Sequence, residues 1–420
     1  MSNPSRDPRP NQKTGFNPET NRNGSIIRHI LIVVLLAISC AAVYHGLNST
    51  RNLEPGWQEI QVSPQNANCS SEFLLMYDFS DYSTNDSIEE LENVNALYTT
   101  LTEDGYAIFT ASEHDTQFRN VRYLNDHINE TVVVEPVLYN ALEQIVRFDS
   151  RYPFLAPVYE CYDQVFSQSD ELDAGRYDPS KSAELMEYAR EAASYANDSQ
   201  MVRLELLGDN QVCLHVADAY LAFAAEHELD TFLDFHWMTN AFLIDYMADA
   251  LTEHGYTSGY LASYDGFNRN LDTRGISYSH NVYDRLDRGV YLPAVYNYEN
   301  PTSIVVLRNY AMSDMDRWHY FTYSDGTITT TFLDPADGTS KSSTDNLFAY
   351  SRDLGCGEIL LRTSPVFIAE ELNVSKLQNL TGDGIYSIWG EGTDICYNES
   401  DANLTLKAEN GGNQYTIILK

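Results

Sequence analysis

The sequence predicts an α+β, or mixed α/β, fold for most of its 420 residues. Some segments carry apolar residues at every third or fourth position, as amphipathic helices do. Others are short runs rich in aliphatic and aromatic residues that are bounded by turn residues, as strands are. The two kinds mix along the chain without strict alternation, which favours an α+β arrangement. With 43% hydrophobic and 21% charged residues, the composition is globular.

In the first half of the chain, each predicted element has its own signal. Residues 87–105 place Ile88, Leu91 and Val94 at helical spacing, and Gly105 is expected to close that helix. Pro136 marks a helix start behind a short strand. The remaining predictions are strands at 71–79 and 106–111, helices at 180–198 and 219–229, and a hairpin at 201–216 that turns at Gly-Asp-Asn.

The second half is richer in strands. A helix with a stripe of apolar residues begins in the segment LDFHWMTNAFLID, and a second helix is expected at 357–372. Strands are predicted at 258–266, 289–297 and 302–312, with hairpins at 318–338, 384–399 and 403–419. The hairpin at 318–338 is expected to turn at Ser-Asp-Gly and to run into a loop.

The N-terminal residues differ from the rest. Residues 1–28 are polar and carry five basic residues, and an uncharged apolar run follows from Ile30 to Tyr44. Flanking apolar residues extend this run to about the 20 residues that a membrane span needs. The basic tail predicts that it stays in the cytoplasm and that the rest of the chain lies outside. An uncleaved signal-anchor is favoured over a lipoprotein signal ending at Cys40, whose lipobox fit is poor.

Charge and cysteines exclude several classes of function. The formal net charge of −35 argues against a nucleic-acid partner, because phosphate backbones require basic surfaces. Five cysteines follow the apolar run, widely spaced and without a Cys-x-x-Cys pair, so a zinc site is not expected. One disulfide, such as Cys69 with Cys396, fits the predicted extracytoplasmic location.

Three segments carry candidate chemistry, and each also has a purely structural interpretation. Asp234 precedes a helix, where it can cap exposed N–H groups or mark a phosphate site. Asp334 and Asp337 lie in a tight turn and can ligate Mg²⁺. Glu358 and Thr363 offer a carboxylate and a hydroxyl near a helix start. The sequence contains no Walker A, Gly-x-Ser-x-Gly or Gly-x-Gly-x-x-Gly motif.

Taken in order, these segments resemble the ApbE-type FAD:protein FMN transferases over residues 72–395. The family signature is Leu-Asp-x-Gly-Gly-x-x-Lys-Gly followed by Asp, and Leu233, Asp234 and Asp245 match it at the right spacing. The other matches are Leu124 and Asn125 of an early segment, Gly266 of a Gly-Gly turn, Ser313 of Thr-Ser-Gly, Asp334, Pro335 and Gly338 of His-Ile-Ile-Asp-Pro-x-x-Gly, and Thr363 of Ala-Asp-x-x-x-Thr.

The resemblance implies a T-fold-like domain that binds FAD and Mg²⁺ and transfers FMN to a threonine of a flavin-accepting redox protein. It implies catalytic positions at Asp234, Asn240 and Asp245, and Mg²⁺ ligands at Glu358 and Thr363. It implies cofactor contacts from Asp234, His236, Gly266, Ser313, Asp334 and Gly338.

Several residues depart from the family pattern. His236 and Trp237 replace the paired glycines, Asn240 replaces the lysine and Thr331 replaces the histidine. The metal aspartate falls on Ile359, or on Glu358 after a slip of one residue. Phosphoryl transfer from a diphosphate needs cations and closely approaching backbone, so these changes predict lost or strongly altered catalysis.

Three hypotheses follow: a degenerate transferase homologue that binds a flavin or a protein, an active Mg²⁺-dependent transferase, and an acidic surface-anchored domain of another fold. The expected organisation is a disordered cytoplasmic tail (1–28), a transmembrane signal-anchor (29–47), a linker (48–71), the ApbE-like ectodomain (72–395) and a C-terminal β-hairpin extension (396–420). A single-pass protein of the cell membrane with an extracytoplasmic ectodomain is therefore predicted.

Overall fold

A computed structural model describes residues 56–62, 72–313, 316, 318–407 and 411–420. The predicted tail and signal-anchor lie outside these residues, as does Cys69. Among the described helices, none is both long and apolar enough to cross a membrane. By Cα proximity, Gly56–Asp81 and Glu90–Lys420 form one compact unit, to which Tyr82–Glu89, including the first turn of the helix Thr84–Phe109, do not belong. The description below concerns the larger unit.

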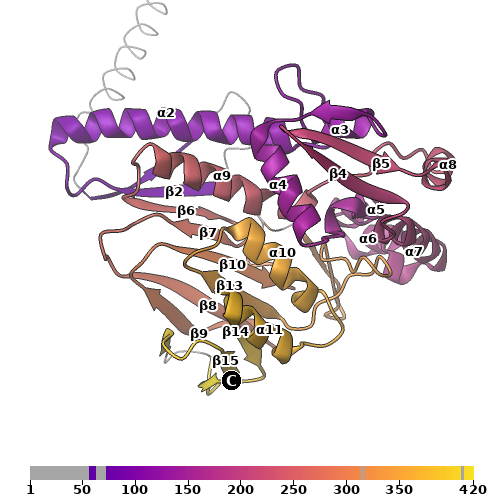
Figure 1. Cartoon of the computed structure of the whole chain (residues 1–420). Coiled ribbons are helices and arrows are strands. Elements are labelled where there is room, and N and C mark those ends of the chain that lie inside the picture. Colours follow the sequence, from indigo (N-terminus) through magenta and orange to yellow (C-terminus); the bar gives the residue numbers. More distant parts are fainter. Residues whose placement is uncertain (1–55, 63–71, 314–315, 317, 408–410) are drawn as a thin grey trace, which may run out of the picture. The chain divides into compact units, whose positions relative to one another are not determined.

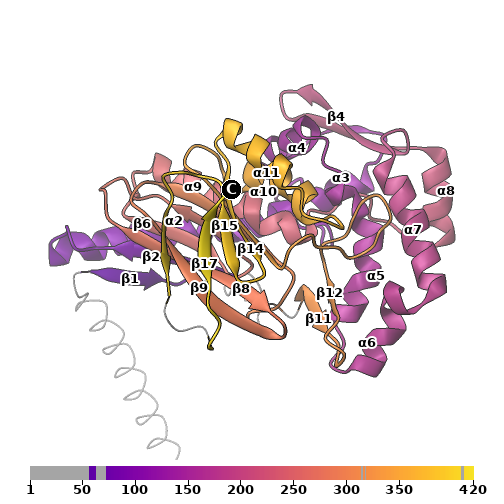
Figure 2. The ribbon, with the colours of Figure 1, turned by 90° about the horizontal axis from the view of Figure 1, so that it is seen from below.

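Its centre is a nine-stranded sheet with the order β1-β2-β6-β7-β10-β13-β14-β15-β17. The strands are β1 (Trp57–Ile60), β2 (Phe73–Asp78), β6 (Gly259–Ser263), β7 (Phe267–Asn270), β10 (Thr302–Arg308), β13 (Asn346–Ser351), β14 (Tyr386–Glu391), β15 (Asp394–Tyr397) and β17 (Thr416–Leu419). All neighbours are antiparallel except β15 and β17, which are parallel (Figure 2).

Helices cover one face of this sheet, and a small sheet covers the other (Figure 1). The helices are α9 (Thr239–Glu253), α10 (Cys356–Phe367) and α11 (Val374–Leu380). The small sheet has the order β16-β9-β8 and consists of β8 (Tyr278–Leu286), β9 (Gly289–Tyr298) and β16 (Asn403–Leu406). Buried side chains such as Tyr296, Phe348 and Ile388 join the two sheets in one hydrophobic cluster.

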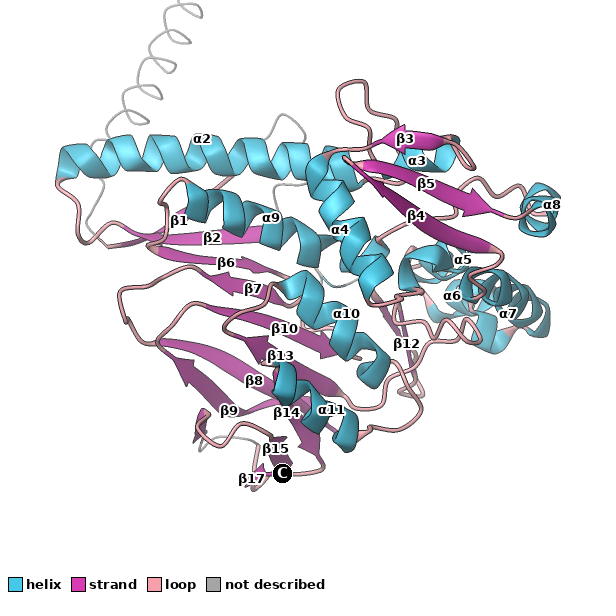
Figure 3. Ribbon diagram, viewed as in Figure 1, coloured by secondary structure: helices cyan, strands magenta, loops and turns pink. Residues whose placement is uncertain are grey.

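A second, mostly helical region is inserted between β2 and β6 (Figure 3). Its helices are α2 (Thr84–Phe109), α3 (Val121–Asp126), α4 (Pro136–Arg147), α5 (Ala156–Phe166), α6 (Glu171–Tyr177), α7 (Ala183–Asn197) and α8 (Asp218–Glu226), with short 3₁₀ turns η1 (Tyr152–Leu155) and η2 (Pro179–Lys181). Its sheet has the order β3-β5-β4, formed by β3 (Thr131–Val133), β4 (Val202–Gly208) and β5 (Gln211–Val216). The hairpin of β11 (Tyr320–Thr322) and β12 (Ile328–Thr330) is tied to this region through the buried Asp178, which accepts hydrogen bonds from Tyr323 and Thr329.

Most predicted elements are confirmed, including the Pro136 helix start and the hairpin at 201–216. The prediction of a strand at 106–111 was wrong, because α2 continues through Gly105 to Phe109. A Cβ atom at Gly105 would lie 2.7 Å from Leu243 Cδ2, so this glycine lets α2 approach α9 closely instead of ending the helix. The burial of Phe109 against Phe242 completes that contact.

The hairpin predicted at 403–419 was also wrong. Strand β16 pairs with β9 of the small sheet, whereas β17 pairs in parallel with β15 of the large sheet. The two strands therefore extend different sheets instead of pairing with each other. Local turn residues could not reveal this, because the partner strands lie far away in the sequence.

Candidate functional site

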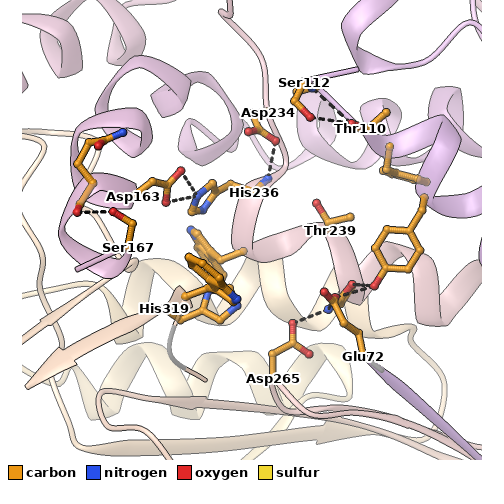
Figure 4. Close-up of a pocket in the computed structure, with 17 residues that line it drawn as sticks. Glu72, Thr110, Ser112, Asp163, Ser167, Asp234, His236, Thr239, Asp265 and His319 are labelled. Carbon is orange, nitrogen blue, oxygen red and sulfur yellow. Dashed lines mark hydrogen bonds and ion pairs between the residues drawn. The ribbon is translucent and has the colours of Figure 1, made fainter. Parts of the chain in front are cut away.

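A cavity of about 640 Å³ lies beside the start of α9 (Figure 4). Three of the sequence-predicted site residues line it, namely Asp234, His236 and Asn240. The other lining residues are Glu72, Tyr106, Phe109, Thr110, Ala111, Ser112, Asp163, Gln164, Ser167, Trp237, Thr239, Asp265, Trp318 and His319. This volume is typical of small-molecule sites in proteins.

The chain enters the site through a fixed turn at Asp234. Buried Asn125 accepts hydrogen bonds from the backbone N–H groups of Phe232 and Leu233 and donates one to the Leu233 carbonyl. The Asp234 carboxylate then accepts a hydrogen bond of 2.8 Å from the His236 backbone N–H. A 3₁₀ turn, η3 (His236–Met238), leads directly into α9. Asp234 therefore shapes the turn and also faces the cavity.

His236 stands in a strained backbone conformation. Its φ is +47°, in the left-handed region that favours glycine, and the resemblance places a glycine at this position. Its ring stacks on Tyr159 at 4.2 Å. Its Nε2 atom lies 3.0 Å from an Asp163 carboxylate oxygen, and its Nδ1 atom lies 3.1 Å from Thr331 Oγ1. The histidine is thus held on three sides.

Burial and neighbouring charges shift the pKa values around this histidine. Burial works to lower the pKa of His236, but the hydrogen bond and negative charge of Asp163 outweigh it and raise the pKa above its usual value. Burial also raises the pKa of Asp234. For His319, burial and the positive charge of His236 lower the pKa to about 4, so His319 is neutral at pH 7.

The next residue that enters the cavity is Asn240, at the lysine position of the family signature. Its side-chain amide donates to Glu72 at 2.9 Å and to Asp265 at 3.0 Å (Figure 4). Tyr106 donates to the same Glu72 oxygen at 2.6 Å. Burial, with the Glu72 charge adding to it, raises the pKa of Asp265 to about 6. A neutral amide therefore stands between two carboxylates where the family has an ammonium group.

Trp237, at the second glycine position, closes part of this region. Its side chain is buried, and its indole N–H donates to the Tyr159 hydroxyl at 3.0 Å. Its ring packs edge-on against Phe332 at 5.0 Å. A large side chain with this many contacts prevents the close backbone approach that paired glycines would allow.

Asp245, predicted as catalytic, does not line this cavity. Its two carboxylate oxygens accept hydrogen bonds of 2.8 Å from the backbone N–H groups of Cys356 and Gly357, at the start of α10. Arg269 pairs with the same carboxylate. Burial raises the pKa of Asp245, although Arg269 and the two N–H groups oppose that shift. In the structure, Asp245 fastens α9 to the N-terminus of α10.

Asp334 and Gly338, predicted as cofactor contacts, form a self-contained turn. Lys341 Nζ lies 2.8 Å from carboxylate oxygens of both Asp334 and Asp337. Gly338 has φ +68°, and a Cβ atom there would lie 2.7 Å from the Ala189 carbonyl oxygen. One ammonium group thus pairs with both aspartates that the sequence suggested for Mg²⁺, and the glycine allows close packing against α7.

Gly266 and Ser313 support the cavity from outside. Gly266 has φ +114°, and a Cβ atom there would lie 2.5 Å from the Val306 carbonyl oxygen. The turn that it permits presents Asp265 to the cavity. The Ser313 N–H donates to Asp316, which forms a buried ion pair with Arg308 at 2.6 Å.

The structure does not bring Glu358 and Thr363 together as metal ligands. Five residues apart on α10, they point about 140° away from each other around the helix. Glu358 pairs with Arg362 at 3.4 Å and Arg147 at 3.6 Å, whereas the buried Thr363 hydroxyl donates to the Ile359 carbonyl. Within the described part of the chain, no three His, Cys, Asp or Glu side chains gather in a way that could hold a metal ion.

Sequence reasoning missed most carboxylates of the cavity. Asp265 directly precedes the predicted Gly266 turn, so that turn was a usable signal. Glu72 lies just before β2, in a segment interpreted only as a strand. Asp163 and His319 gave no signal, because a single acidic residue on a helix and a single histidine beside a strand are common.

These residues do not fit the diphosphate of FAD with Mg²⁺. Four carboxylates line the cavity, and neither lysine nor arginine appears among its described lining residues. The aromatic side chains of Phe109, Trp237 and Trp318 could still contact a flavin ring. The ring portion of the cofactor is therefore compatible with the cavity, whereas its phosphates find no lysine or arginine among the described lining residues.

Comparison with known proteins places the fold. No protein-family model matches the sequence, and no curated protein matches it closely enough to count as a relative. Among solved structures, the ApbE protein of Thermotoga maritima matches with a TM-score of 0.55 and 12% identity, over 84% of this chain and 97% of that one. A histidine-to-glycine mutant of the flavin transferase ApbE from Vibrio cholerae matches with a TM-score of 0.50 and 8% identity, over the same shares. The chain therefore has the ApbE-type fold.

Proposed function

We propose that this chain is a membrane-anchored, extracytoplasmic ApbE-like protein that has lost FMN transfer and acts through binding of a flavin or a protein. The observation that carries the proposal is the position of Asn240. Its amide bridges Glu72 and Asp265 at the place where the family signature has a lysine. A neutral side chain there leaves no lysine to offset the charge of a diphosphate, and the imidazole of His236 is paired with Asp163.

Two further observations support the loss of catalysis. The cavity carries His236 and Trp237 at the glycine positions, and both are held by several contacts. The residues predicted to hold Mg²⁺, Glu358 and Thr363, are engaged with arginines and with the backbone of their own helix. Opening the glycine positions and freeing the predicted Mg²⁺ ligands would therefore require several side chains to break their contacts.

The competing proposal is an active Mg²⁺-dependent transferase that flavinylates a threonine of a partner redox protein. The fold supports it, because one solved structure with the same fold is a flavin transferase. In this version, cavity carboxylates such as Asp234 and Asp265 would have to recruit the metal themselves.

One experiment separates the two proposals. The full-length protein is incubated with FAD, with and without Mg²⁺, and AMP release is followed by chromatography beside the Vibrio cholerae transferase. Flavin fluorescence is titrated in parallel. Quenching without AMP release supports the degenerate binding protein, whereas Mg²⁺-dependent AMP release supports the enzyme. If neither quenching nor AMP release is observed, protein binding is the remaining role.

The predicted anchor needs its own test. Membrane fractions from expressing cells are extracted with alkaline carbonate, and an accessible tag on the C-terminal side is probed with protease. We expect the full-length chain to stay with the membrane and a chain lacking residues 1–47 to be released.

A further inference from the structure

The cavity offers hydrogen-bond acceptors and negative charge at more than one point. Glu72, Asp163, Asp234 and Asp265 contribute carboxylates to it. At pH 7, Asp265 is mainly ionised, because its pKa is about 6. Even with His236 protonated, the carboxylates outnumber the positive charge. A ligand that brings donors and positive charge therefore complements this lining.

One of these acceptors is visibly unsatisfied. The Oδ1 atom of Asp265 is buried and has no hydrogen-bond partner among the described residues, while its Oδ2 atom accepts from Asn240. The Nδ1 atom of the neutral His319 is likewise buried without a partner. A buried polar atom without a partner costs free energy, and the negative charge of Asp265 is therefore only partly offset by its neighbours. A ligand that places positive charge beside this carboxylate would compensate it.

Aromatic rings form the remaining walls. Tyr106, Phe109, Trp237 and Trp318 all line the cavity. Faces of such rings attract alkylammonium groups through their quadrupoles, and their apolar surface also accepts methylene chains. Carboxylates and aromatic rings together recognise an organic cation better than a bare metal ion, which would need several convergent oxygen ligands.

The four carboxylates form two groups in the cavity. Asp234 and Asp163 contact His236, which precedes α9. Glu72 and Asp265 contact Asn240, which lies in the first turn of α9. Asn240 follows Asp234 by six positions; at the rise of 3₁₀ and α helices, six positions correspond to about 9–12 Å along the axis. Two ammonium groups joined by a flexible aliphatic chain can span such a distance.

From these observations we infer that the cavity binds an organic cation of the linear polyamine class. One ammonium group would lie against Asp265 and Glu72, another against Asp234, and the methylene chain between them along Trp237. This inference goes beyond the proposed function, which leaves the ligand open between a flavin and a protein.

Calorimetric titration of the full-length protein tests the inference, with spermidine as the probe and uncharged 1,8-octanediol as a probe of similar length. We expect one spermidine site at pH 7.5 and 0.3 M NaCl, a concentration that screens the acidic surface. Octanediol should not bind. The absence of spermidine binding, or binding of many equivalents without saturation, would overturn the inference.

Two variants locate the site. Asp265→Asn keeps the size of the side chain and removes its charge, so spermidine should bind about tenfold more weakly. Asp401→Asn removes the same charge from an exposed surface position and should leave the affinity unchanged. Equal affinities in both variants would place the polyamine elsewhere and contradict the inference.

FAD competition distinguishes failure of the inference from failure of the proposed function. If spermidine binds and FAD neither binds nor competes, the inference stands and flavin binding is lost as a role. If FAD binds and spermidine does not, the inference fails while flavin binding stands.

Discussion

The Nδ1 atom of His236 lies 3.1 Å from the Oγ1 atom of Thr331. In the family pattern that the sequence resembles, position 236 holds a glycine and position 331 a histidine. Here the imidazole comes from position 236 and contacts the side chain at position 331, while its Nε2 atom pairs with Asp163. A histidine is therefore retained between the two segments, although the residue that supplies it has changed.

The ion pair of His236 with Asp163 should make folding stability depend on pH. The pKa of His236 is raised in the folded protein, so the pair stabilises the fold below the ordinary histidine pKa and loses this effect as the pH rises through the folded-state value. Urea unfolding at pH 6 and pH 8 should show a larger loss of unfolding free energy in the wild type than in His236→Gln. Equal losses in the two proteins would refute the predicted coupling.

A lysine at position 240 should invert the ligand preference of the cavity. Asn240→Lys places an ammonium group between Glu72 and Asp265, where it competes directly with a bound cation. Spermidine affinity should fall about tenfold or more, and FAD affinity should rise. Calorimetry measures both.

Asn240→Met is the matched control for the lysine variant, because it adds similar bulk without charge. If Met and Lys weaken spermidine equally, the size of the side chain explains the effect and the electrostatic prediction is wrong.

Asp245→Asn should weaken the fold without altering the cavity. The substitution replaces one carboxylate oxygen with an amide that cannot accept from the α10 backbone, and it leaves Arg269 with less compensating charge. A loss of about 2–4 kcal/mol in unfolding free energy is expected. Asp249→Asn, at the exposed second partner of Arg269, should cost less than about 1 kcal/mol. Chemical denaturation compares the two variants. If folded Asp245→Asn no longer binds the cavity ligand, Asp245 has a direct role in ligand binding and the prediction is wrong.

Gly266→Ala should be strongly destabilising because two costs coincide. The residue has φ +114°, and the added Cβ atom would lie 2.5 Å from the Val306 carbonyl oxygen. We expect a loss of about 2–4 kcal/mol in unfolding free energy. Gly392→Ala also has a positive φ but meets open space, so about 1 kcal/mol is expected there. Thermal and urea unfolding should rank the two variants in this order; the reverse order would count against a tight turn at Asp265.

The sequence allowed the fold to be predicted further than the site. Apolar periodicity located α9, whose predicted stripe of Trp237, Ala241 and Ile244 is buried, and turn residues located most hairpins. It failed at Gly105, because a glycine that permits helix packing looks the same in sequence as one that ends a helix. It also failed for β16 and β17, whose partners are set by distant strands.

Within the site, motif matching named three residues that line the cavity, Asp234, His236 and Asn240, but it did not give their contacts. The resemblance correctly indicated the Asp234 turn, and the positive φ of His236 fits a glycine position. It could not show that the Asp245 oxygens are used by α10 or that Lys341 neutralises Asp334. Those outcomes depend on which charged group lies next to each carboxylate in space, and a linear spacing does not contain that information.

The pairing of β2 with β6 has a consequence for the order of folding. Tyr77 pairs with Gly259, and the entire inserted region lies between these two residues in the chain. During synthesis, β2 can pair with β1 at once, but it must wait for β6 until the insertion has been made. The contacts within α4–α8 are local and can form earlier. Until β6 arrives, one edge of β2 is unpaired, and its apolar residues Phe73, Leu75 and Tyr77 lack the core that later buries them, so this edge is open to aggregation before folding is complete.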